Sequence, residues 1–390
     1  MSEFITRALP ELLSFIVDNR GRSCPTVDEG FPLIATNCLR DGLRYPTSEN
    51  VRYVDEETYM NWFRAHPEPG DVLFVCKGSP GRVAVVPDPV PFCIAQDMVA
   101  LRADRTVVDP TYLYYRLKSP DVQAAIPNLH VGTMIPHFKK GDFGKLRFEV
   151  HTDVGVQRGI AKVLGSLDDK IVSATRKEST AAALIEALYQ RAIAAPGTTS
   201  EPLMDALTIA FGEPFGGTQF TSPGEGRPLI RIRDLKTFTS RVWTSESRPK
   251  EVLVQPGEVV VGMDAEFRPT WWLGQPGLLN QRVCRITSPG AGPAFVREAL
   301  QAPMARVEGY KTGTTVIHLN KSDLLREQIL WPMTEVRAEF DRKAEPILSA
   351  LVASAQGRES LAAMRDVLLP RLMTGKIGVK DAESVVEGTV

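Results

Sequence analysis

Residues 160–192 read IAKVLGSLDDKIVSATRKESTAAALIEALYQRA, and this stretch decides the fold of the chain. Its apolar side chains recur at alternating steps of four and three residues, a pattern typical of a helix that pairs with another along a narrow seam. The pattern predicts one helix from Thr152 to Ala195, in which only Glu178 interrupts the apolar positions. Those positions are Ile160, Leu164, Leu167, Ile171, Ala174, Ala181, Ile185, Leu188 and Ala192.

A helix of this length needs a partner. About 40 residues make a rod of about 60 Å, and one apolar stripe on such a rod cannot be buried by the helix itself. The partner is therefore expected elsewhere in the chain or on another subunit. The polar run Asp168-Asp169-Lys170 resembles half of a nuclease metal site, but it is better explained as part of the solvated face of the helix.

Composition limits the classes of function. The net charge of −1 gives no general attraction to nucleic acid, so DNA binding would require local basic patches or a partner. The sequence has no run of eighteen apolar residues, and its start predicts a short amphipathic helix over residues 9–17 instead of a signal peptide. Five cysteines without C-x-x-C spacing favour a reducing, cytoplasmic location and argue against a structural zinc site.

The order of motifs before the long helix recurs after it. Pro256-Gly257-Glu258 follows Pro69-Gly70-Asp71 at a distance of 187 residues. Gln281 follows Gln96 at 185 residues, and both are expected to make a structural hydrogen bond more readily than to read a base. The segment 313–318 (GTTVIH) follows 132–137 (GTMIPH) at 181 residues. The chain is therefore predicted to be a tandem duplication.

A second long helix is expected after Trp331-Pro332, because a duplication requires a counterpart of the first. A ladder of seven-residue steps supports it, with a kink or break expected near Pro346 and further weakening at Gly357. The ladder residues are Phe340, Ile347, Ser354, Leu361 and Leu368, joined by Val336, Ala350 and Met364.

The predicted fold class is α+β, with two similar α/β lobes separated by an antiparallel pair of long helices that form an intrachain coiled coil. The expected boundaries are 1–150 for the first lobe, 151–196 for the first helix, 197–331 for the second lobe, 332–378 for the second helix and 379–390 for a tail.

The whole pattern resembles the specificity subunit of type I restriction–modification systems, in which two target-recognition domains alternate with two helical spacers in a pseudo-twofold arrangement. No single stretch is a catalytic motif, and the resemblance rests on the order and duplication of several. They are 15–23 (FIVDNRGRS), 25–34 (PTVDEGFPLI), 159–171 (GIAKVLGSLDDKI), 229–235 (LIRIRDL), 262–267 (GMDAEF), 278–283 (LLNQRV) and 368–375 (LLPRLMTG).

The resemblance implies a mechanical role and no chemistry in this chain. Each lobe would read one half of a bipartite DNA target, and the helix pair would set the unread gap. The chain would bind no cofactor and would direct two methyltransferase subunits and the restriction/translocase subunits in defence against foreign DNA. S-adenosylmethionine, Mg and ATP would be bound by those partners, and no membrane would be involved.

The candidate DNA contacts lie at two corners and in the loops around them. Lys77 and Arg82 could clamp phosphates or reach guanine, and Asp264 and Glu266 could accept from cytosine. Each candidate has an alternative without DNA. Residues 77–82 could be an ordinary hairpin, the basic residues a solvated face, and His137 and His318 histidines with partners inside the protein. Trp271 and Trp272 are expected in the core. The full set is Lys77, Ser79, Arg82, Thr133, His137, Lys139, Lys140, Arg231, Arg233, Lys236, Asp264, Glu266, Arg268, Lys311, Thr314 and His318.

Two other classes of function stay open. A stand-alone nuclease or methyltransferase would need degenerate motifs. Asp109-Pro110-Thr111-Tyr112 resembles a methyltransferase tetrapeptide but lacks its second proline, so a helix start explains it better. A non-DNA scaffold would use the duplicated lobes to bind protein.

Overall fold

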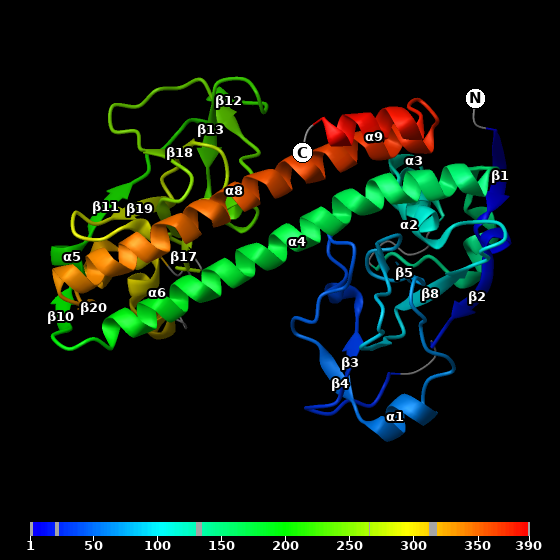
Figure 1. The fold of residues 1–390 in the computed structure, drawn as a ribbon, viewed down its shortest axis with the longest axis horizontal. Helices are drawn as coiled ribbons and strands as arrows, with labels where there is room; N and C mark the ends of the chain where they lie inside the picture. Colours follow the sequence, from blue (N-terminus) through cyan, green and yellow to red (C-terminus); the bar gives the residue numbers. More distant parts are fainter. Residues whose placement is uncertain (1–2, 20–22, 130–134, 265, 312–317, 389–390) are drawn as a thin grey trace. The chain divides into compact units, whose positions relative to one another are not determined.

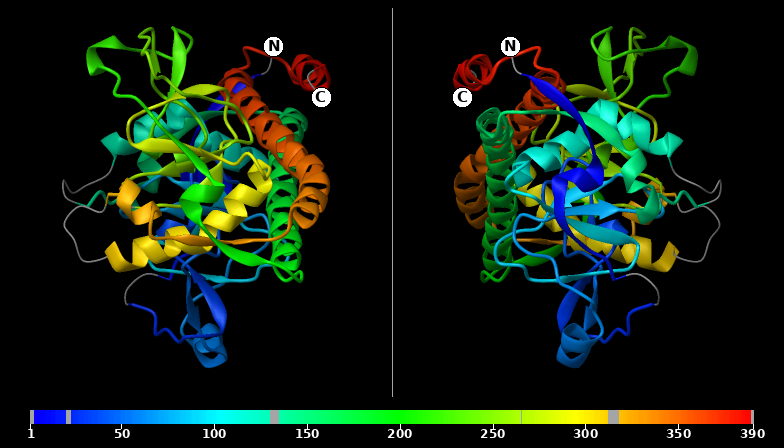
Figure 2. Two further views of the ribbon diagram at one scale, coloured as in Figure 1. Left: turned by 90° about the vertical axis from the view of Figure 1, so that its left-hand side faces the viewer. Right: turned by 90° about the vertical axis from the view of Figure 1, so that its right-hand side faces the viewer.

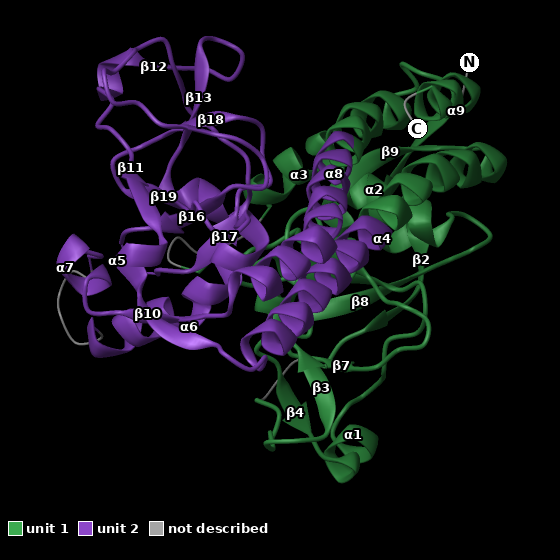
Figure 3. Ribbon diagram, turned by 60° about the vertical axis from the view of Figure 1, so that its left-hand side comes forward, with its two compact units in different colours: residues 1–171, 361–390 green, residues 172–360 purple. Residues whose placement is uncertain are grey.

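A computed structural model describes residues 3–19, 23–129, 135–264, 266–311 and 318–388. The chain divides into two compact units, coloured in Figure 3. Unit 1 comprises residues 1–171 and 361–390, and unit 2 comprises residues 172–360. Two helices of 40 residues each, α4 (Val154–Ile193) and α8 (Thr334–Met373), contribute one part to each unit.

Unit 1 contains lobe 1, which is built on three small sheets. A four-stranded sheet has the order β2-β8-β5-β6, a three-stranded sheet has the order β4-β3-β7, and β1 pairs with β9 (Figure 1). Its strands are β1 (Phe4–Ala8), β2 (Leu13–Val17), β3 (Phe31–Ile34), β4 (Arg52–Val54), β5 (Val72–Val75), β6 (Val83–Val85), β7 (Cys93–Ile94), β8 (Met98–Ala103) and β9 (Arg147–His151). Its short helices are α1 (Glu56–Asn61), α2 (Pro110–Lys118) and α3 (Pro120–Ala125).

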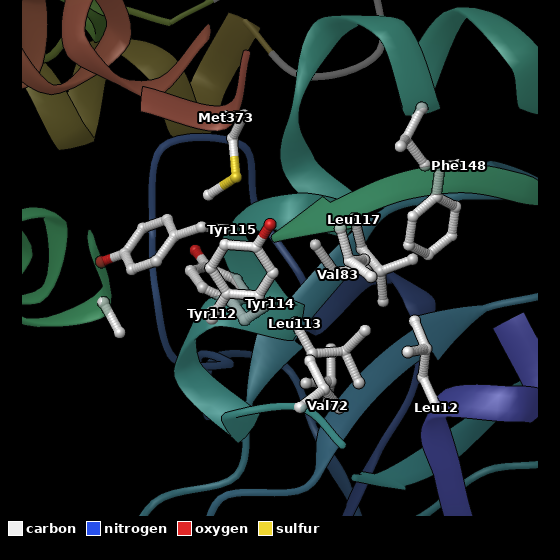
Figure 4. Packing of buried hydrophobic residues seen from close by; sticks show 14 of the residues in the cluster. Leu12, Val72, Val83, Tyr112, Leu113, Tyr114, Tyr115, Leu117, Phe148 and Met373 are labelled. Carbon is white, nitrogen blue, oxygen red and sulfur yellow. The ribbon is translucent and has the colours of Figure 1, made fainter. Parts of the chain in front are cut away.

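Helix α2 lies in the hydrophobic core of unit 1. Asp109 caps it by accepting a hydrogen bond from the backbone N–H of Tyr112 at 3.0 Å, and Pro110 occupies its first turn, as the sequence predicts. Tyr112, Tyr114 and Tyr115 are fully buried, and Figure 4 shows them packed near Met373 of α8. The lobe therefore shares one core with the helix segments of its own unit.

Unit 2 contains lobe 2, which repeats this architecture. A four-stranded sheet has the order β11-β19-β16-β17, a five-stranded sheet has the order β12-β14-β13-β18-β15, and β10 pairs with β20. Its strands are β10 (Thr199–Pro202), β11 (Thr208–Phe211), β12 (Phe220–Thr221), β13 (Arg227–Ile230), β14 (Trp243–Thr244), β15 (Leu253–Val254), β16 (Val259–Gly262), β17 (Pro269–Trp271), β18 (Gly277–Leu279), β19 (Val283–Thr287) and β20 (Gln328–Trp331). Its helices are α5 (Leu203–Ala206), α6 (Pro293–Lys311) and α7 (Lys321–Leu324).

Strand pairing confirms the duplication. In lobe 1, β3 runs parallel to β7, with Leu33 opposite Cys93. In lobe 2, β13 runs parallel to β18, with Leu229 opposite Leu278. The antiparallel ladders β8–β5–β6 and β19–β16–β17 also correspond strand by strand. Trp271 and Trp272 are buried, as expected.

In each unit, the segment of α4 and the segment of α8 lie side by side in antiparallel fashion, as the sequence predicts (Figures 1 and 2). In unit 1, Arg365 of α8 reaches Asp168 of α4. In unit 2, Arg358 reaches Glu178 at 2.9 Å, so the one charged position in the α4 stripe has a charged partner. The α4 stripe is otherwise buried or half-buried throughout.

Several expectations about local structure are wrong. Residues 4–17 form β1, a 3-10 turn (Leu9–Leu12) and β2 instead of a helix, because β1 pairs with the distant β9 and β2 with β8. Helix α8 runs unbroken past Pro346 and Gly357, both of which are exposed. Ala350 is also exposed, while the buried positions include Leu348 and Leu351.

A further correction concerns the polar face of α4. Asp168 is buried, although Asp169 and Lys170 are exposed as expected. Its carboxylate lies 2.7 Å from Arg365 and accepts a hydrogen bond from the Tyr115 hydroxyl at 2.6 Å. The segment expected as a tail also contains a helix, α9 (Val379–Glu387), which buries Ala382 and Val386 in the core of unit 1.

Candidate nucleic-acid interface

The connection from β5 to β6, residues 77–82, forms a tight corner in lobe 1 that we call corner 1. Gly81 has a φ of 94°, and a Cβ there would lie 2.6 Å from Ile126 Cδ1, so only glycine fits. The Gln123 side chain also donates to the Gly81 carbonyl at 2.9 Å. Corner 1 is therefore fixed against the segment of α3 and the turn that follows it.

Two of the predicted residues at corner 1 point to solvent and one is anchored. Lys77 and Ser79 are exposed, and neither makes a side-chain hydrogen bond or ion pair within the described part of the chain. Arg82 is half-buried, donates to the Leu39 carbonyl at 3.1 Å and lies 3.4 Å from Asp41. Lys77 and Ser79 are therefore available to a ligand, whereas Arg82 is partly occupied with holding the 39–41 loop.

The segment 136–140 lies beside corner 1. Lys77 and His137 form an antiparallel bridge, and the Gly78 N–H donates to the Pro136 carbonyl at 3.0 Å. His137 is half-buried and Lys139 is exposed, while Lys140 lies 3.3 Å from Asp18. The structure thus brings Lys77 together with His137 and Lys139, which the sequence placed in separate candidate segments.

The connection from β16 to β17, residues 264–268, is the counterpart in lobe 2, and we call it corner 2. Asp264 Oδ1 lies 2.6 Å from His318 Nδ1, and Asp264 Oδ2 lies 3.6 Å from Arg282 Nε. Glu266 pairs with Lys236 at 3.1 Å on the surface, and Arg268 is exposed. Corner 2 therefore presents both signs of charge.

The sequence suggests that Arg231, Arg233, Lys236 and Arg241 form a basic cluster along a strand edge, but the structure places the first three at and in a turn that follows β13. Arg231 precedes a 3-10 turn (Ile232–Lys236), and its guanidinium lies 3.2 Å from the buried Asp234. Arg231 therefore helps to hold the turn, whereas the side chains of Arg233 and Lys236 are exposed.

Lys311 is also held within the lobe. Its ammonium donates to the His318 carbonyl at 2.7 Å and lies 2.8 Å from Asp323. Burial alone would raise the pKa of Asp323, but hydrogen bonds from Lys311 and from the Asn320 backbone lower it. Thr133 and Thr314 lie outside the described residues.

Asp97 and Arg282 also lie at these corners, although the sequence did not single them out as candidates. Both directly follow the paired glutamines, so the repeat itself was the signal that could have found them. The glutamines do not behave as expected: Gln281 is exposed, and the buried Gln96 Oε1 has no hydrogen-bond partner among the described residues.

Two negative findings apply to the described ranges. They contain no group of three or more His, Cys, Asp and Glu side chains that could hold a metal ion. None of their helices combines the length and apolar composition that crossing a membrane requires.

The fold is shared with the specificity subunits of type I restriction–modification systems, and comparisons confirm the resemblance seen in the sequence. The type I S subunit from M. genitalium superposes with a TM-score of 0.60 over 95% of this chain and 96% of that chain, at 13% identity. The HsdS subunit from Thermoanaerobacter tengcongensis aligns over 96% of this chain and 97% of that chain at 17% identity, but its TM-score of 0.37 adds no argument.

A curated relative connects the sequence to the same class. The type I restriction enzyme EcoBI specificity subunit from Escherichia coli is 29% identical over 192 residues, which is 47% of this chain. The match spans 40% of the length of that relative. No protein-family model matches the chain.

Proposed function

We propose that the chain is the DNA-sequence-specificity subunit of a type I restriction–modification complex. The observation that carries this proposal is the repeated lobe, because each copy presents an exposed corner at the same point of the same β-ladder. A protein with two copies of one recognition surface is suited to a target made of two half-sites. The similarity to the EcoBI specificity subunit supports the same reading.

The chemistry of the corners fits contact with DNA. Lys77 and Lys139 in lobe 1, and Arg233 and Arg268 in lobe 2, are exposed cations that can contact phosphates or guanine. Asp264 supplies an acceptor for a base amino group. With a net charge of −1, the chain depends on these local groups and on partner subunits for its affinity.

The helix pair supplies the other half of the function. α4 and α8 each have 40 residues, and mostly apolar side chains line their seam, together with the ion pairs Glu178–Arg358 and Asp168–Arg365. We propose that this pair sets the length of the unread gap between the half-sites. Its polar faces, and the helix end near Arg371, would dock two methyltransferase subunits.

Catalysis would belong to the partners. In this proposal the chain is not an enzyme, S-adenosylmethionine is bound by the methyltransferase subunits, and Mg and ATP serve the restriction/translocase subunits. The complex would work in the cytoplasm, where its free cysteines stay reduced.

Selection from random DNA duplexes tests the proposal. The chain would be assembled with the methyltransferase encoded beside it, and bound duplexes would be sequenced over several rounds. The expected result is two short defined sequences at constant separation. Bound duplexes without any sequence preference would contradict it.

A further inference from the structure

Because the chain is an internal repeat, residues of lobe 1 can be matched with residues of lobe 2 by their backbone hydrogen bonds. In lobe 1, the Cys76 N–H donates to the Asp97 carbonyl at 2.8 Å, and the Phe138 N–H donates to the Cys76 carbonyl at 2.8 Å. In lobe 2, Met263 N–H donates to the Arg282 carbonyl at 2.9 Å, and Leu319 N–H donates to the Met263 carbonyl at 2.8 Å.

The bridges that follow complete the correspondence. Lys77 bridges to His137 and Asp264 bridges to His318, both in antiparallel fashion. Lys77 is therefore equivalent to Asp264, and Asp97 to Arg282, with a histidine at the third position in both lobes.

The charges at the first two positions are exchanged between the lobes. Lobe 1 has a cation at its corner (Lys77) and a carboxylate at the second position (Asp97), whereas lobe 2 has a carboxylate at its corner (Asp264) and a cation at the second position (Arg282). Lys77 is exposed and Asp97 is half-buried, and neither makes an ion pair within the ranges that the structure describes. The side chain of Arg282 is half exposed.

We propose that this pair of positions reads one G·C base pair in each half-site, and that the exchanged charges make the two lobes read it in opposite orientations. The inference rests on the proposed function and adds the residues that set one base pair. In lobe 1, guanine would face Lys77 at the corner. In lobe 2, cytosine would face Asp264 and guanine would face Arg282.

The major-groove edge of a G·C pair explains the choice. Guanine offers the acceptors O6 and N7, and cytosine offers the N4 amino donor, so a cation and a carboxylate side by side match one pair. Asp264 and Arg282 lie 3.6 Å apart, close enough to contact the two bases of one pair. Reversing the order of the two charges reverses the orientation of the pair that matches.

Exchanging the charges tests the inference in the full chain assembled with its methyltransferase. One variant carries Lys77→Asp with Asp97→Arg, and the other carries Asp264→Lys with Arg282→Asp. Each should select a motif in which one G·C pair of one half-site is reversed, while the other half-site and the gap are unchanged. Preference at that base pair should change by about 10-fold to 100-fold.

Two neutral variants guard against misfolding of the double variants. Lys77→Met and Asp264→Leu, which remove the charged group without supplying another donor or acceptor, should each weaken the preference at that same single position. Arg105→Asp and Lys250→Asp, which change exposed cations elsewhere in lobe 1 and lobe 2, are controls that should leave the motif unchanged.

Three results would overturn the inference. The first is an unchanged motif in the exchange variants, and the second is an equal loss of affinity for all duplexes, which would indicate phosphate contacts. The third is loss of preference over several neighbouring positions, which would indicate support of the lobe structure. If the unsubstituted chain selects no bipartite sequence, both the proposed function and this inference fail. If the unsubstituted chain selects a bipartite sequence and the exchange variants select the same one, only this inference fails.

Discussion

Replacing Asp168 by alanine should destabilise unit 1 more than any surface change on α4. Asp168 and Arg365 leave only 2% and 4% of their side chains exposed, and their charged atoms are 2.7 Å apart. Burial alone would lower the pKa of Arg365, but its hydrogen bonds and charge interactions with Asp168 and Asp366 together outweigh burial and raise it, so the guanidinium stays charged. Removing one partner of such a buried pair costs about 3–5 kcal/mol.

Hydrogen exchange is the suitable assay, because two units need not unfold together and one unfolding free energy is then not defined. Asp168→Ala should reduce the protection of amides in α2 and in residues 361–373, since Tyr115 also loses its acceptor. Amides of β16 and β19 in unit 2 should keep theirs. Lys170→Ala, an exposed neighbour on α4, is the control and should change protection by about 0.5 kcal/mol or less. The reasoning is refuted if Asp168→Ala loses no more protection than Lys170→Ala.

Three further predictions concern pH, the gap and salt. Burial, with the nearby Arg116 charge, lowers the pKa of His151 to about 4, so its contribution to stability is complete above about pH 6.5 and lost as the pH falls towards 4. Hydrogen exchange of unit 1 amides, corrected for the intrinsic effect of pH, should show a loss of protection of about 2 kcal/mol over that range. His151→Asn should reduce this loss, and an equal pH slope in the variant would contradict the prediction. Inserting seven residues into both helices, after Lys177 in α4 and after Gly357 in α8, should lengthen the unread gap and leave both half-sites intact. An unchanged gap in the selected motif would show that the helix pair does not set the gap length. The affinity of the assembled complex for duplex DNA should fall steeply as salt rises, whereas a protein-binding scaffold would show no such dependence.

The helix pair was predictable because its information is local and periodic. The steps from Ile160 to Ala192 define the stripe of α4, and the repeated Pro-Gly-Asp/Glu motif marks the same turn in both lobes. What the pattern could not show was the partner of each charged residue. In the sequence, Glu178 interrupts the apolar stripe, and only the structure shows that Arg358 pairs with it. Asp168 was expected to be solvated because its partner Arg365 is 197 residues away in the chain.

The N-terminal error has the same origin. Residues 9–17 have helical spacing, but β1 and β2 gain their hydrogen bonds from β9 and β8, far along the chain. Long-range pairing overrides local spacing in such short segments. The exposure of Lys77 and the anchoring of Arg231 and Lys311 likewise depend on contacts that spacing does not encode.

Methylation mapping at single-molecule resolution tests the central claim most directly, in cells that carry this chain together with the methyltransferase encoded beside it. Two copies of one reader on a single chain predict methylated sites composed of two short defined sequences with an unread middle of constant length. One continuous motif, or a middle of variable length, would contradict the account.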